Sequence, residues 1–149
     1  MDSGHIAPEL SEKLIAAAGA ARQNSYAPYS GFRVGAALLG QSGKIYTGCN
    51  VENASYGATI CAERTALVKA VSEGERAFRA IAVVADTGEE EVPVPCGVCR
   101  QVLAEFSPEM TVIMAALTGK REIAALERLL PAPFSLSLHK TGDRRGSRL

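Results

Sequence analysis

The chain is organised around two short stretches, Cys61-Ala62-Glu63-Arg64 and Pro95-Cys96-Gly97-Val98-Cys99. Together they offer three cysteine thiolates and one carboxylate. A tetrahedral zinc site with three protein ligands leaves its fourth position to water, which is the pattern of a catalytic rather than a structural site. We therefore predict that the three cysteines bind one zinc ion, and that Glu63 transfers protons beside the metal.

The spacing of these residues restricts where the metal can lie. Residues i and i+2 lie about 200° apart around a regular helix, so Cys61 and Glu63 can serve one metal only if it lies over a helix end. We predict that Cys61 occupies the first position of one helix, and that Cys96 and Cys99 lie on one side of the start of another. Two helix N-termini would then offset the negative charge of the thiolates, and Arg64 would donate hydrogen bonds to the sulfur atoms.

Length and composition limit the class of protein. The 149 residues fit a single domain, 1–149, that can form a core without disulfides. Sixteen basic and sixteen acidic residues balance to zero, which argues against nucleic-acid or membrane binding. The first residues do not form a signal peptide, and the longest apolar runs are too short to span a membrane. We therefore expect a cytoplasmic protein whose clustered cysteines are reduced and bind metal.

Hydrophobic periodicity and turn residues divide the chain into helices and strands. Strands are predicted at 32–39, 44–49, 79–85 and 111–117. Helices are predicted at 8–25, 61–71 and 96–106, and the segment 123–130 is expected to be helical or mixed. This order is typical of an α/β sandwich with a mixed sheet. Residues 1–8 are expected to form a loose leader and residues 140–149 a disordered tail.

Four motifs resemble the small homotetrameric zinc-dependent cytidine deaminases. They are Tyr29-Ser30-Gly31-Phe32-Arg33-Val34-Gly35-Ala36-Ala37, Gly48-Cys49-Asn50-Val51-Glu52-Asn53-Ala54-Ser55-Tyr56, Cys61-Ala62-Glu63-Arg64-Thr65-Ala66 and Pro95-Cys96-Gly97-Val98-Cys99-Arg100-Gln101. They include the zinc-deaminase signature, a His or Cys two residues before a Glu and a later Pro-Cys-x-x-Cys. The resemblance covers residues 10–134 and is only approximate over 118–128. It implies a three-layer α/β/α sandwich with a mixed, roughly five-stranded sheet.

The resemblance also implies an activity and a metal site. The activity is hydrolytic deamination of cytidine and deoxycytidine to uridine and deoxyuridine with release of ammonia, a step of pyrimidine salvage. Cys61, Cys96 and Cys99 match the ligands of one zinc ion per chain. Glu63 matches the proton shuttle, and Arg64 matches the arginine that compensates the charge of the thiolates.

The remaining matched positions concern the nucleoside and the assembly. The backbone N–H of Ala62 matches the donor to the pyrimidine O2, Asn50 and Glu52 match the pair that binds the ribose 3′-hydroxyl, and Phe32 matches an aromatic near the base. Three further residues match positions that act across subunit boundaries. Ala54 and Tyr56 match residues that reach the nucleoside of a neighbouring subunit, and Phe134 matches an aromatic donated across an interface. The resemblance therefore implies a homotetramer with shared active sites.

Less specific interpretations remain open at this point. The cysteines could form a structural zinc site with Cys49 as the fourth ligand, although such a site has no use for Glu63. Phe32 and Phe134 could be core residues, and His5 and His139 are expected to be surface residues.

Other functions are also compatible with the signature. The substrate could be another cytosine-like small molecule, such as a nucleoside antibiotic, but the Asn50 and Glu52 pair favours a plain ribose. A deaminase acting on polynucleotides would need basic and aromatic side chains that this neutral, aromatic-poor chain lacks. A binding module that kept the zinc and lost the chemistry is disfavoured by the intact Glu63.

Overall fold

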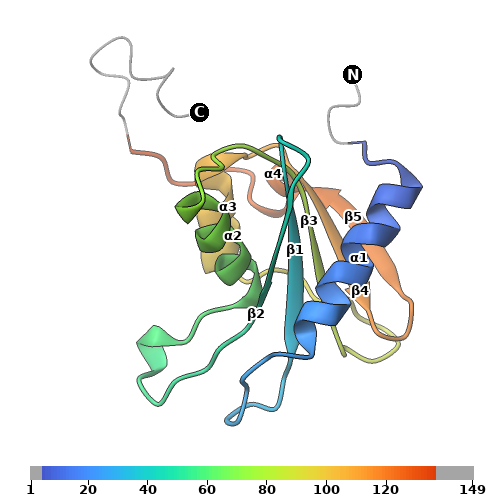
Figure 1. Cartoon of the computed structure of the whole chain (residues 1–149), viewed down its shortest axis with the longest axis vertical. Coiled ribbons are helices and arrows are strands. Elements are labelled where there is room, and N and C mark those ends of the chain that lie inside the picture. Colours follow the sequence, from blue (N-terminus) through green and yellow to red (C-terminus); the bar gives the residue numbers. More distant parts are fainter. Residues whose placement is uncertain (1–4, 137–149) are drawn as a thin grey trace.

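A five-stranded mixed sheet forms the middle layer of the structure (Figure 1). The computed structural model describes residues 5–136. The strands lie in the order β2-β1-β3-β4-β5, where β1 is Val34–Gly40, β2 Ile45–Cys49, β3 Phe78–Ala85, β4 Thr111–Ala116 and β5 Arg121–Ala125. β3 and β4 run parallel and the other neighbouring pairs run antiparallel, so the predicted mixed sheet is confirmed.

Helices cover both faces of this sheet (Figure 1). Helix α1 (Pro8–Arg22) packs on one face, and helices α2 (Ala62–Ser72) and α3 (Gly97–Phe106) pack on the other. A hydrophobic core lies on each face of the sheet. Successive side chains of β1 point to opposite faces, so Leu38 packs in the core under α2 and α3 while Leu39 packs in the core under α1. The predicted three-layer α/β/α arrangement is confirmed. Within residues 5–136, no helix combines the length and the apolar composition that crossing a membrane requires.

The first helix is shorter than predicted. It begins at Pro8 as expected but ends at Arg22, whereas the sequence pattern extended it to residue 25. The chain turns toward β1 here, since the Ser25 hydroxyl donates to the Val34 carbonyl and the Arg33 guanidinium donates to the Gln23 carbonyl. The expected tail at 140–149 and the first four residues of the expected leader lie outside the described residues.

The segment after β4 differs from the sequence-based expectation. The structure divides the 123–130 region between the end of strand β5 and the short helix α4 (Leu126–Leu129). β5 pairs antiparallel with β4, with Ile123 opposite Ile113, and forms one edge of the sheet. Its first three residues are exposed, so it lacks the alternating apolar pattern that identifies a half-buried strand. The free edge of β4 decides the structure here, because strand formation depends strongly on context.

Two glycines allow helices to lie directly against the sheet. A Cβ added at Gly48 in β2 would lie 2.5 Å from the Ala66 nitrogen and 2.7 Å from the Ala62 oxygen, both in α2. A Cβ added at Gly35 in β1 would lie 1.9 Å from the Ala18 oxygen in α1. Real Cβ atoms do not approach backbone this closely, so glycine is required at both positions. The Gly48 contact sets the position of the N-terminal turn of α2, which carries Glu63.

Candidate active site

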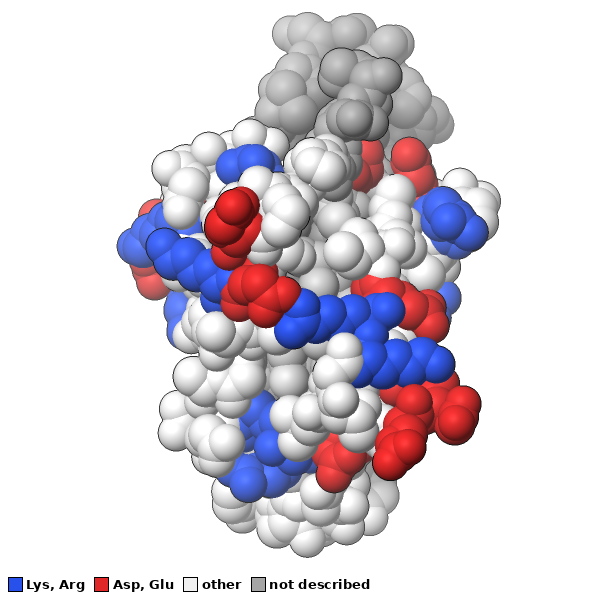
Figure 2. Space-filling view, turned by 90° about the vertical axis from the view of Figure 1, so that its right-hand side faces the viewer, with Lys and Arg blue, Asp and Glu red and all other residues white. Residues whose placement is uncertain are grey.

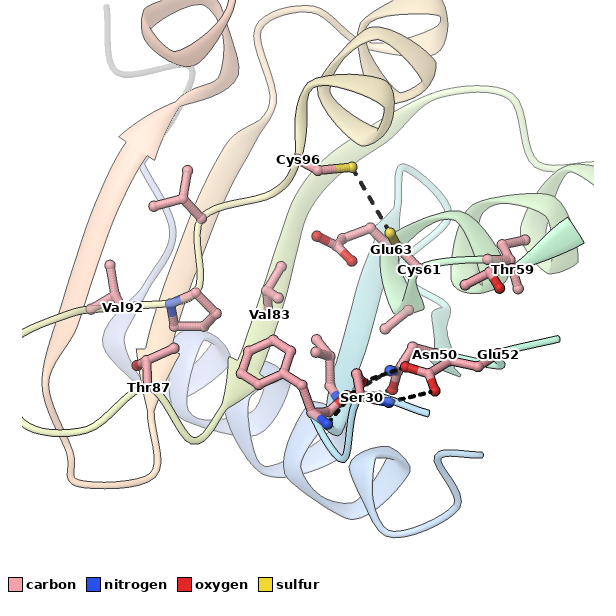
Figure 3. A pocket seen from close by; sticks show the side chains of 16 residues that line it. Ser30, Asn50, Glu52, Thr59, Cys61, Glu63, Val83, Thr87, Val92 and Cys96 are labelled. Atoms are coloured by element: carbon pink, nitrogen blue, oxygen red, sulfur yellow. Dashed lines mark hydrogen bonds between the residues drawn. The ribbon is translucent and has the colours of Figure 1, made fainter. Parts of the chain in front are cut away.

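The three clustered cysteines meet where α2 and α3 begin, and Figure 3 shows two of them, Cys61 and Cys96. Cys61 is the N-cap residue of α2 and Cys96 that of α3, both with extended backbone, and Cys99 lies in the first turn of α3. Their sulfur atoms all lie within 4.8 Å of one another, so the predicted cluster is confirmed. The prediction that Cys61 occupies the first helical position was wrong by one residue. A residue just before the helix can point its side chain across the helix end. The Cys61 sulfur thereby reaches the sulfur atoms of Cys96 and Cys99.

The geometry of the cluster fits zinc. Tetrahedral zinc with Zn–S bonds of about 2.3 Å holds its sulfur ligands about 3.8 Å apart. The Cys61 and Cys96 sulfur atoms are 3.9 Å apart. Cys49 does not belong to the cluster found among the described residues, so the structure gives no support to a four-cysteine structural site. The three thiols can therefore supply three of four tetrahedral positions.

Charge around the sulfur atoms favours thiolate at Cys61. Arg64 Nη2 donates a hydrogen bond to Cys61 Sγ over 3.6 Å. Hydrogen bonding from Cys99, assisted by Arg64, lowers the pKa of Cys61 to about 5. The pKa of Cys99 is raised because that thiol keeps the proton of its hydrogen bond to Cys61, and burial adds to the shift. This asymmetry is what a hydrogen-bonded cluster with one thiolate and a neighbouring arginine produces.

Glu63 points into the cavity on the side where the cysteines lie (Figure 3). It sits in the first turn of α2 and is only 5% exposed. Burial raises the pKa of its carboxyl to about 7. A carboxyl group with a pKa near the working pH can both accept and donate a proton, which is what general acid–base catalysis needs.

Cys61, Glu63 and Cys96 line one side of a cavity of about 420 Å³. Its wall combines the starts of α2 and α3 with β1, β3 and three loops, and no Lys or Arg contributes to it. The lining consists of Ser30, Phe32, Val34, Asn50, Glu52, Thr59, Ile60, Cys61, Ala62, Glu63, Val83, Thr87, Val92, Pro93, Val94 and Cys96. A small, mostly apolar cavity with a few convergent polar groups is typical of a site for a small molecule.

Glu52 is held by the turn that precedes β1. Its Oε1 atom accepts hydrogen bonds from the N–H groups of Tyr29 (2.9 Å) and Ser30 (3.1 Å), and its Oε2 atom accepts one from the Ser30 hydroxyl. The hydroxyl bond is the main reason that the pKa of Glu52 lies below its usual value. The carboxylate is therefore ionised at neutral pH and fixed at the cavity wall.

Asn50 holds the next part of the same segment. Its Oδ1 atom accepts from the Val34 N–H (2.9 Å), and its Nδ2 atom donates to the Phe32 carbonyl (2.8 Å). Asn50 and Glu52 both line the cavity from one extended segment. The resemblance predicted that the two residues act as a pair. It did not predict that they also hold residues 29–34, which carry Phe32 to the cavity.

The other predicted substrate-binding residues divide into two groups. Phe32 lines the cavity and is 44% exposed, and Ala62 lines it from the start of α2. In contrast, Ala54 is exposed, Tyr56 is 81% exposed and Phe134 is 70% exposed, and none of the three lines this cavity. Phe134 is therefore not a core residue of its own chain.

The sequence analysis missed the loop that forms the opposite wall. No functional role was predicted for residues 86–95, but Thr87, Val92, Pro93 and Val94 all line the cavity. A signal was present in the sequence, since the apolar run 92–94 leads directly to the Pro95 that precedes Cys96. A segment that delivers a metal ligand to a site must itself pass close to that site.

The fold and the site define a zinc-binding α/β deaminase domain. Residues 8–115 match the family model described as the cytidine and deoxycytidylate deaminase zinc-binding region, and the chain belongs to this family. A cytidine deaminase of Sporosarcina psychrophila is 56% identical over 126 residues, which cover 83% of this chain and 90% of that protein. A cytidine deaminase of Halalkalibacterium halodurans is 54% identical over 125 residues, covering 83% and 93%.

A solved structure has the same fold. The crystal structure of a cytidine deaminase from Burkholderia pseudomallei superposes with a TM-score of 0.79 at 49% identity. The match covers 83% of this chain and 98% of that one. The sheet order and the helices on both faces therefore agree with those of a known deaminase.

Proposed function

We propose that this chain is a zinc-dependent enzyme of pyrimidine salvage that hydrolyses cytidine and deoxycytidine to uridine and deoxyuridine and releases ammonia. The observation that carries the proposal is the buried Glu63 carboxyl in a cavity that is also lined by Cys61 and Cys96, two of the three clustered cysteines. The relatives at 56% and 54% identity, both named cytidine deaminases, support the choice of substrate.

The chemistry follows from the groups in the cavity. Zinc held by Cys61, Cys96 and Cys99 would lower the pKa of a water and so supply a nucleophile at neutral pH. Glu63 accepts a proton from that water and passes protons to the ring nitrogen and the amino group of the substrate. The pyrimidine carbon gains an oxygen and the amino group leaves as ammonia. Arg64 offsets the negative charge of the thiolates throughout.

The remaining polar groups hold the nucleoside. In this proposal the backbone N–H of Ala62 donates to the pyrimidine O2, because the first N–H groups of a helix have no partner within the helix. Asn50 and Glu52 bind the ribose 3′-hydroxyl from their fixed positions on the cavity wall. Phe32 packs beside the base.

We propose that the substrates are free nucleosides rather than nucleotides or nucleic acid. The cavity lining contains Glu52 and no Lys or Arg, so a phosphate would meet a negative charge without a cation to balance it. On the face that Figure 2 shows, acidic and basic side chains alternate and do not gather into a basic patch. A surface that binds a nucleic-acid backbone normally carries such a patch.

We further propose a cytoplasmic homotetramer in which subunits complete one another's active sites. Tyr56 and Phe134 support this assembly, because both rings are exposed, at 81% and 70%, and both residues match positions that act across subunit boundaries. In the tetramer Ala54, Tyr56 and Phe134 would reach the nucleoside of a neighbouring subunit. The free cysteines support the cytoplasm, where thiols stay reduced.

The proposal is tested by incubating the zinc-loaded protein with cytidine. The ultraviolet spectrum and the ammonia assay should both show conversion to uridine, and the Glu63→Gln protein should show almost none. If the wild-type protein converts neither cytidine nor deoxycytidine while it contains zinc, the proposed function is wrong.

A further inference from the structure

The side-chain amide of Gln101 binds both backbone polar groups of Phe134. The Phe134 N–H donates to Gln101 Oε1 over 3.0 Å, and Gln101 Nε2 donates to the Phe134 carbonyl over 2.8 Å. Gln101 lies in α3 and Phe134 lies 33 residues later in the chain. The paired bonds imitate one hydrogen-bonded pair of an antiparallel ladder, with the side chain in the role of a peptide group.

This pair of hydrogen bonds matters because of where Phe134 lies. The segment from Leu130 to residue 136 contains neither helix nor strand, and the Phe134 ring is 70% exposed. Packing within the chain therefore leaves most of the ring uncovered and cannot by itself fix its direction. Bonds at the N–H and C=O of one residue limit its backbone rotation, and this limits the direction of its Cα–Cβ bond.

The residue before Gln101 holds the start of the same segment. Arg100 Nη1 donates to the Leu129 carbonyl over 2.8 Å, and Arg100 Nε donates to the Pro95 carbonyl over 2.7 Å. Two successive residues of α3 thus fix the segment that ends in Phe134. The same helix carries Cys99, a proposed zinc ligand, in its first turn, so α3 connects the cysteine cluster to the exposed Phe134.

We propose that Gln101 is a positioning residue, which holds Phe134 in the orientation that presents its ring to the active site of a neighbouring copy of the chain. The inference rests on the proposed function, which assigns the Phe134 ring to a neighbouring site. Gln101 itself touches no substrate. Its effect on catalysis passes entirely through Phe134.

A double-mutant comparison tests this dependence in the zinc-loaded protein. Gln101→Met keeps the length of the side chain and removes both hydrogen bonds. It should lower kcat/KM for cytidine about 5- to 30-fold, mainly through KM, with zinc content unchanged. In the Phe134→Ala background the same substitution should cause no further loss. Gln101→Glu keeps the acceptor for the Phe134 N–H, so its kcat/KM should lie between those of wild type and Gln101→Met. Gln41→Met, at an exposed turn residue, is the matched control and should behave as wild type.

The proposal would be overturned if Gln101→Met left kcat/KM unchanged. It would also be overturned if the losses in kcat/KM from Gln101→Met and Phe134→Ala multiplied in the double mutant. Either outcome would leave the proposed function intact, provided that wild type deaminates cytidine and Glu63→Gln does not.

A second measurement is independent of the substrate. The chain contains no tryptophan, so Phe134→Trp introduces a single tryptophan, which can be excited selectively over the four tyrosines. Adding Gln101→Met to it should lower the tryptophan anisotropy, and equal anisotropy in the two proteins would refute the positioning role.

Discussion

The cysteine corner of the cavity and the exposed aromatics are built in opposite ways. In the cysteine corner, which we define as Cys61, Glu63, Cys96 and Cys99, Glu63 is 5% exposed and Cys99 is fully buried, while Cys61 and Cys96 open onto the cavity. Tyr56 and Phe134, the exposed aromatics, are 81% and 70% exposed. The corner is fixed by helix starts that pack on the sheet, whereas the aromatics lie on short connecting segments. One chain can therefore preorganise the reacting groups by itself, whereas packing within the chain leaves both aromatic rings mostly uncovered.

The largest expected effect lies in the cysteine corner. Glu63→Gln preserves the shape of the side chain but removes the carboxyl group that accepts and releases a proton near neutral pH. Deamination of cytidine should fall by about 10²- to 10⁴-fold, the usual contribution of general acid–base catalysis, or by more because one residue serves several transfers. Zinc content and thermal stability should stay near wild type. Activity within a few-fold of wild type would remove Glu63 from the mechanism.

A smaller effect is expected at the exposed aromatics. Phe134→Ala should lower kcat/KM about 5- to 150-fold, since stacking of an aromatic on a base contributes about 1–3 kcal/mol. Zinc should be retained, because Phe134 lies outside the cavity that the cysteine corner lines. Light scattering would show whether the assembly also loosens.

Mixing the two variants separates shared from unshared sites. When Glu63→Gln and Phe134→Ala subunits exchange, some sites combine Glu63 from one chain with Phe134 from another. Activity should then exceed the mean of the two parent proteins. A mixture that stays at that mean after proven exchange, or a protein that is monomeric, would contradict the donated aromatic.

Substrate form should produce a smaller difference than loss of Glu63. Cytidine monophosphate should react at least about 5-fold less efficiently than cytidine, the effect of ~1 kcal/mol of like-charge repulsion in water. Competition between the two compounds in one reaction gives the ratio of their kcat/KM values. Comparable turnover of both, or efficient editing of single-stranded DNA, would refute the preference for free nucleosides.

The sequence predicted local relations in the cysteine corner well. The Cys61-Ala62-Glu63 spacing restricts the metal to a helix end, because residues i and i+2 diverge elsewhere in a helix. The Cys96-Gly97-Val98-Cys99 spacing places its two cysteines on one side of a helix. The error of one residue at Cys61 concerns a helix boundary, and boundaries depend on how the preceding loop enters the helix. Strands β1 to β4 were also predictable, since their apolar runs are bounded by turn residues.

Contacts between distant segments were not predictable from spacing. Glu52 meets Tyr29 and Ser30 from 23 and 22 residues away, and Gln101 meets Phe134 from 33 residues away. Such pairs depend on how the sheet brings loops together, which no periodicity along the chain encodes. Strand β5 was missed for a related reason, because an edge strand with exposed residues at its start shows little apolar alternation.

The smallest expected effect concerns Cys49, which is half-buried at the end of β2 and outside the cluster. Cys49→Ala should leave about one zinc per chain and nearly full activity, because three sulfurs and one water complete a catalytic zinc site. Metal analysis after gel filtration provides the measurement. Cys99→Ala is the matched control and should lose most of the zinc, since it removes a buried ligand of the cluster. A loss of zinc in Cys49→Ala equal to that in the control would make the site a four-cysteine structural one, and the cysteine corner would then lose its open position for the reacting water.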